Sequence, residues 1–110
     1  MDPRTFVPDW RKVVTYAAPG PQPVLLCDEP DLRVLVAGLE PGARIPAHPE
    51  RAAVYHALAG EGTLTLDGER LPFATGATVI VPRGASRGIE ATSRLAFLAV
   101  RVGSELEPGA

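Results

Sequence analysis

The sequence predicts an all-β domain, either an antiparallel sandwich or a barrel, and three observations support this. Short apolar runs with β propensity follow one another from Val24 onward, separated by turn residues. Glycine (11) and proline (12) are frequent among the 110 residues, which favours many turns and disfavours long helices. After Val14 no helical period of useful length appears. We therefore expect about eight short, closely spaced strands.

The N-terminal part, residues 1–31, is expected to form an irregular arm and a first edge strand. Its prolines disfavour regular helix or sheet over most of its length. Asp9 is a suitable N-cap for one short turn over residues 10–14. Trp10 and Tyr16 are large apolar anchors, which we expect to dock either on the domain or on a partner subunit.

The strands of the predicted barrel lie within residues 32–102. Residues 32–39 (LRVLVAGL) are nearly all apolar, as in a strand covered on both faces. Thr63–Leu66 alternates polar and apolar residues, which indicates a half-buried strand, and Asp67-Gly68 predicts a tight hairpin after it. The other expected strands are residues 24–27, 52–58, 69–71, 77–81, 87–90 and 95–102. Residues 103–110 are expected to form a flexible tail.

Charge and composition argue against several functional classes. A formal net charge of −2 disfavours a broad nucleic-acid surface. No apolar run reaches the roughly 18 residues of a membrane span, and Met1–Arg4 does not lead into an apolar stretch as a secretory signal does. We therefore expect a cytoplasmic protein. The single cysteine, Cys27, has no basic neighbour in sequence and is interpreted as a packing residue.

Two spacings of Gly, His and Pro resemble the two sequence motifs of the cupin family. The first, G-x5-H-x-H-x3,4-E-x6-G, is matched by Gly42, His48, Glu50 and Gly60. The second, G-x5-P-x-G-x2-H-x3-N, is matched by Gly76, Pro82, Gly84 and Arg87. The resemblance covers about residues 32–102. It implies a cupin-type double-stranded β-helix, a jelly-roll barrel with an internal pocket, and a homodimer.

The metal-binding positions of these motifs are only partly kept. The resemblance implies four ligands, of which His48 is kept, Glu50 replaces a second histidine, Ala53 replaces the glutamate and Arg87 replaces the last histidine. Arginine stays protonated and has no lone pair to donate. A unit charge about 4 Å from a dication costs roughly 8 kcal/mol at an effective dielectric near 20. We therefore expect no metal at the usual place and no other cofactor.

Four residues are predicted to line a ligand pocket. An inward Arg87 would suit an anionic or carbonyl-bearing ligand, although it could instead face outward or pair with Glu50. His48 and Glu50 are two residues apart and share one face of a strand, a pairing that supports general acid–base chemistry. If Ala53 faces inward, alternation places Tyr55 inward and His56 outward; a β-bulge would exchange them.

These residues support four functional hypotheses. The first is binding of a small anionic or carbonyl-containing molecule by His48, Glu50, Tyr55 and Arg87. The second is a metal-independent isomerase, cyclase or lyase that uses His48 or Tyr55 for proton transfer. The third is a metal-dependent oxygenase or isomerase with a rearranged ligand set, His48, Glu50 and His56. The fourth is an accessory protein with a vestigial pocket. Fold alone cannot choose among them, because cupins host very many reactions.

Overall fold

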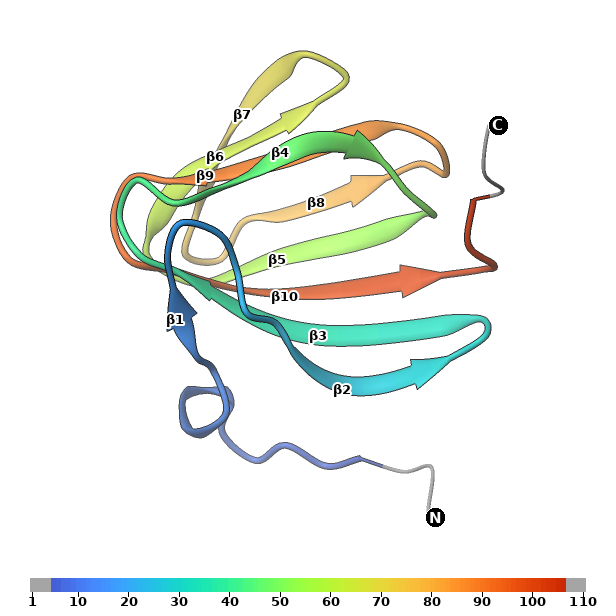
Figure 1. The fold of residues 1–110 in the computed structure, drawn as a ribbon, viewed down its shortest axis with the longest axis horizontal. Coiled ribbons are helices and arrows are strands. Elements are labelled where there is room, and N and C mark those ends of the chain that lie inside the picture. The colour runs from blue at the N-terminus through green and yellow to red at the C-terminus, as the bar shows by residue number, and fades with distance from the viewer. Residues whose placement is uncertain (1–4, 107–110) are drawn as a thin grey trace.

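The computed structural model describes residues 5–106, which form two facing β-sheets (Figure 1). Across these residues the chain has one short 3-10 helix, η1 (Trp10–Lys12), and ten strands. The strands are β1 (Tyr16–Ala17), β2 (Val24–Glu29), β3 (Leu32–Leu39), β4 (Arg44–Pro49), β5 (Ala53–Ala59), β6 (Glu61–Leu66), β7 (Glu69–Ala74), β8 (Thr78–Val81), β9 (Ser86–Ala91) and β10 (Leu95–Val102). The predicted all-β class is confirmed.

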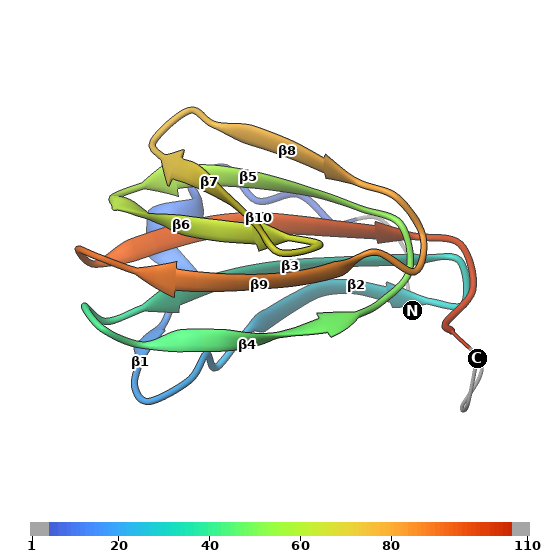
Figure 2. The same ribbon diagram turned by 90° about the horizontal axis from the view of Figure 1, so that it is seen from above.

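The connectivity of the strands is that of a jelly roll. The first sheet has the order β1-β3-β10-β5-β8, with β2 also paired to β3, and the second sheet has the order β4-β9-β6-β7. From β3 to β10 the chain passes repeatedly from one sheet to the other, and strands of both sheets run along the same long direction (Figure 2). This arrangement is the predicted double-stranded β-helix.

Two strands differ from the elements that the sequence predicts. β4 was not expected, because Pro46 and Pro49 lie within it. It forms because it is an edge strand, where a proline does not remove a hydrogen bond from the middle of a sheet. β1 pairs with β3 through only two residues, too few to leave a pattern in the sequence. The expected turn over residues 10–14 is η1, and Asp9 caps it by accepting a hydrogen bond from the backbone N–H of Arg11.

The N-terminal arm docks on its own domain. Tyr16 lies against Gly38, where an added Cβ would be 2.7 Å from the ring Cδ1 atom. The guanidinium carbon of Arg94 is 4.3 Å from the centroid of the Tyr16 ring. Trp10 and Val36 share a hollow on the outer face of the first sheet. Of the two predicted docking sites for the arm, the structure therefore shows its own domain. The homodimer stays a prediction, which light scattering would check.

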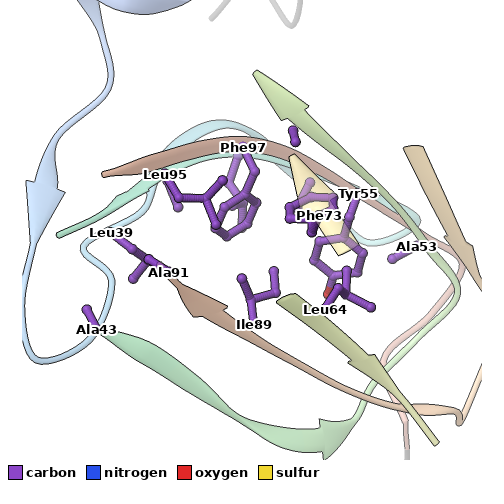
Figure 3. Close-up of a cluster of buried hydrophobic side chains, with 14 of the residues drawn as sticks. Leu39, Ala43, Ala53, Tyr55, Leu64, Phe73, Ile89, Ala91, Leu95 and Phe97 are labelled. Carbon is purple, nitrogen blue, oxygen red and sulfur yellow. The ribbon is translucent and has the colours of Figure 1, made fainter. Parts of the chain in front are cut away.

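The core lies between the two sheets (Figure 3). Phe97 is its centre, because the ring centroids of Phe73 and Tyr55 both lie 6.2 Å from that of Phe97. Such tilted and edge-on pairs stabilise a core beyond the area they bury. The other buried core residues are Leu35, Ala37, Leu39, Ala43, Ala53, Ala57, Leu64, Val81, Ile89, Ala91, Leu95 and Ala99.

The described part of the predicted tail is hydrogen-bonded to the barrel. The backbone N–H of Gly103 donates to the carbonyl of Asp31 over 3.0 Å. Arg51 donates to the carbonyl of Gly103 over 3.1 Å, and Arg83 donates to that of Ser104. Residues 107–110 lie outside the described residues, as do residues 1–4, on which the signal-sequence prediction rests. In the described part of the chain, no helix has the length and apolar character needed to cross a membrane.

Candidate functional site

A cavity of about 50 Å³ lies inside the barrel. One water molecule needs roughly 10–15 Å³ of such space, so the cavity can hold a small molecule. Its apolar lining consists of Pro21, Pro23, Leu35, Ala37, Ile45, Ile89 and Phe97, with Gly88 between them. Four polar side chains also line it, His48, Tyr55, Arg87 and Arg101. Among the described residues of this lining, none carries a carboxylate.

A β-bulge in β4 positions His48 beside the cavity. Ile45 pairs with Ile89 and His48 pairs with Arg87, so the two residues between them face Gly88 alone. A Cβ on Gly88 would lie 2.8 Å from the carbonyl oxygen of Ile45, so only glycine permits this close approach. The extra residue shifts the alternation of β4, and Ile45 and His48 both line the cavity.

The hydrogen bond of His48 identifies its tautomer. Its Nδ1 atom lies 3.0 Å from the carbonyl oxygen of Pro46. A carbonyl can only accept, so Nδ1 carries the proton in this contact. In the neutral ring the lone pair is then on Nε2. His48 can therefore accept a proton through Nε2 while Nδ1 holds the ring in place.

The two side chains at the centre of β5 face opposite ways. Residues 53–56 pair with β8 in regular register. Tyr55 points inward, is 3% exposed and lines the cavity. His56 lies on the other face, with Nδ1 2.7 Å from the Thr78 hydroxyl oxygen. The alternation predicted for these two residues is confirmed. The bulge that would bring His56 to the cavity does not form, so the rearranged ligand set of His48, Glu50 and His56 is wrong.

The cupin ligand positions of this chain do not fit a metal site. The described residues contain no group of three His, Cys, Asp or Glu side chains that could hold an ion. Glu50 does not line the cavity. Its carboxylate accepts from the backbone N–H of Arg51 over 2.9 Å and lies 3.9 Å from the Nε atom of Arg51. The position of the last ligand holds the cation of Arg87, which repels a dication.

Neighbouring groups keep Glu50 ionised. Partial burial raises the pKa of this carboxyl, but the hydrogen bond from the Arg51 backbone outweighs it together with the charges of Arg101, Arg51 and His48. The pKa of Glu50 therefore lies below its ordinary value. The predicted proximity of Glu50 to His48 acts through this charge, not through a shared cavity wall.

Arg87 is buried to 1% exposure and joins two loops. Its Nε donates to the carbonyl of Ala85 over 2.9 Å, and its Nη1 to that of Arg51 over 2.9 Å. Its Nη2 donates to the carbonyls of Glu50 and Pro82 over 3.0 and 3.3 Å. Four of its five N–H donors are thus used by backbone. Arg87 faces inward as one prediction had it, but its hydrogen bonds go to the β4–β5 and β8–β9 loops.

Arg101 lines the cavity, and no sequence motif indicated it. Its Nε atom is buried and has no hydrogen-bond partner among the described residues. The alternation of β10 contains the missing signal. Leu95, Phe97 and Ala99 face the core, and the next residue on that face is Arg101.

Comparison with known proteins places this site in a family. No curated protein matches the sequence. Solved structures do match. The SPY1581 protein of unknown function from Streptococcus pyogenes has a TM-score of 0.82 and 26% identity over 94% of this chain and 91% of its own. An uncharacterized protein with a double-stranded β-helix domain from Klebsiella pneumoniae has a TM-score of 0.80 and 18% identity over 92% of each chain.

A larger enzyme shares the fold over part of its length. Salicylate 1,2-dioxygenase from Pseudoaminobacter salicylatoxidans matches with a TM-score of 0.70 and 19% identity, over 79% of this chain and 27% of that chain. Residues 35–101 match the family model described as a cupin domain. This chain therefore belongs to the cupin family.

Proposed function

We propose that the chain binds a small organic molecule with a carboxylate or carbonyl group in the barrel cavity. The observation that carries this proposal is the composition of the lining, in which two arginines, a histidine and a tyrosine enter an otherwise apolar space. A few converging polar groups in an apolar cavity are typical of small-molecule sites. The absence of a carboxylate among the described lining residues makes the cavity favourable to a negative charge.

One of the similar structures is named for a reaction on salicylate, an aromatic carboxylate. That compound belongs to the chemical class proposed here. The likeness does not extend the proposal to the oxygenase reaction, because His56 faces outward and Arg87 occupies a ligand position. The proposal is limited to binding of the compound class.

Filling the cavity tests the proposal. Ala37 lines the cavity and Ala57 is a core residue that does not. We expect small organic acids to raise the melting temperature of the wild-type protein by binding to the native state. Ala37→Leu should abolish this rise, whereas Ala57→Leu, which overpacks the same core, should keep it. If every tested acid and carbonyl compound left the wild type unchanged, the pocket would be vestigial and the proposal wrong.

A second candidate function is proton transfer on a bound carbonyl compound. The hydrogen bond from His48 Nδ1 to Pro46 favours it, because it leaves Nε2 as the proton acceptor of the neutral ring. Tyr55 lines the same cavity and carries a hydroxyl that can donate to a carbonyl oxygen. Together they suit removal of a proton next to a carbonyl group, as in an isomerase or lyase.

Hydrogen exchange detects this chemistry without knowledge of the natural substrate. Pyruvate in D₂O would lose its methyl proton signal if the protein removed and returned these protons. We expect His48→Gln to abolish the exchange and Tyr55→Phe to slow it by about 10²-fold or more. His56→Gln, a change on the outer face, should leave it unaltered. Exchange that persists in His48→Gln would exclude His48 as the base.

A further inference from the structure

Three arginines besides Arg87 lie near the same end of the barrel, and they differ in how they are partnered. Arg33 donates to the Asp28 carboxylate through two nitrogens, each over 3.3 Å. Arg51 donates through both terminal nitrogens to the C-terminal segment, and its Nε lies 3.9 Å from a Glu50 oxygen. For Arg101, no side-chain hydrogen bond and no ion pair within 4.0 Å is found among the described residues.

Arg101 is therefore the cation with unused donors. Its strand position places it between Arg33 on β3 and Ala53 on β5, on the face that continues toward Phe97. The nearby charge of Glu50 attracts it without reaching hydrogen-bond distance. A buried donor without a partner is costly, and an arginine retains its charge at every physiological pH. A ligand oxygen in the cavity would remove this cost.

We propose that Arg101 is the group that recognises the ligand, through a forked hydrogen bond to one carboxylate. This inference rests on the proposed binding function and names its ligand class, a small monocarboxylate with an apolar body. Two N–H groups of a guanidinium match the two oxygens of a carboxylate. The apolar body faces Phe97 and Ile45, and the cavity of about 50 Å³ suits a short or single-ring compound.

Calorimetric titration with matched acids and amides tests the inference. The probes are benzoate against benzamide and isobutyrate against isobutyramide, which have nearly the same shape and differ in charge. We expect the wild-type protein to bind each acid about 10- to 100-fold more tightly than its amide. Arg101→Gln should reduce this preference to about one, and Arg101→Lys should keep part of it, because lysine retains the charge but not the fork.

Arg33→Gln is the matched control. Arg33 lies beside Arg101 in register but does not line the cavity. Removal of its charge should leave the acid-over-amide preference unchanged. If Arg33→Gln and Arg101→Gln lowered the preference equally, the effect would be long-range attraction and the assignment to Arg101 would be wrong. If the acids bound wild type and Arg101→Gln alike, the binding function would stand and the role of Arg101 would fall. If wild type bound none of the four probes, both would fall.

A measurement on the wild-type chain removes the dependence on a folded Arg101→Gln variant. The Nε–H resonance of Arg101 can be followed by NMR and assigned by its absence in Arg101→Lys. Addition of benzoate should shift it and slow its exchange with water, because the proton enters a hydrogen bond. Benzamide should shift it less. An Nε–H resonance that stays in place while benzoate binds would overturn the inference.

Discussion

The two ends of the barrel are built from the same strands and held by different forces. At one end, Leu39 and Leu95 are 0% exposed and pack with other apolar side chains. At the other end, the strands that carry these residues reach a group of arginines, among them Arg87 and Arg101. The first end is stabilised by burial of apolar area. The second is held by charged hydrogen bonds to backbone, and it leaves one donor set for a ligand.

The largest expected effect is at the apolar end. Phe73 is 0% exposed and contacts Phe97 edge-on. Phe73→Ala should lower the free energy of unfolding by about 3–5 kcal/mol, because it removes buried area and leaves a cavity. Urea unfolding measures this. Any folded Phe73→Ala protein should still prefer acids to amides, and loss of that preference would contradict the separation of the two ends.

A smaller loss is expected for the loop-joining arginine. Arg87→Gln removes donors from the carbonyls of the β4–β5 and β8–β9 loops and should cost about 2–3 kcal/mol in urea unfolding. Arg70→Gln, at an exposed position on β7, should change the stability by less than about 0.5 kcal/mol. Equal stability of Arg87→Gln and the wild type would show that these hydrogen bonds do not hold the open end.

Arg101→Gln is expected to change stability least among the core-facing substitutions. Its Nε makes no hydrogen bond among the described residues, so its removal frees a buried donor. The free energy of unfolding without ligand should change by less than about 1 kcal/mol, in either direction. This is the sharpest contrast with Arg87, which stands on the neighbouring sheet. A loss as large as that of Arg87→Gln would mean that Arg101 has a structural role.

The smallest effect concerns pH. Since the pKa of Glu50 is lowered in the folded state, its ionised form adds stability at pH values above its ordinary pKa of 4.5. This contribution is lost as the pH falls through the lowered folded pKa. Melting temperatures from pH 7 to pH 3 should therefore show wild type above Glu50→Gln near neutrality, with the difference shrinking below pH 4.5. A difference that does not vary with pH would exclude this linkage.

Periodicity predicted much of the fold. The ranges expected for residues 32–39 and 95–102 agree with β3 and β10, and alternation placed Tyr55 inside and His56 outside. Periodicity failed where a bulge breaks the count, as in β4. There the residue that decides the direction of His48 is Gly88 on another strand, through a close backbone approach that no local pattern records.

The amino-acid sequence alone was enough to predict the all-β class, the cupin motifs and the loss of their metal ligands, because these depend on residue types at short spacings. Tertiary structure alone decided which arginine is free. The carbonyls that occupy Arg87 belong partly to residues 36 and 37 positions away, whereas Arg101 has the same chemistry and meets no acceptor among the described residues. A side chain's charge is a local property, but its partners depend on how distant loops are brought together.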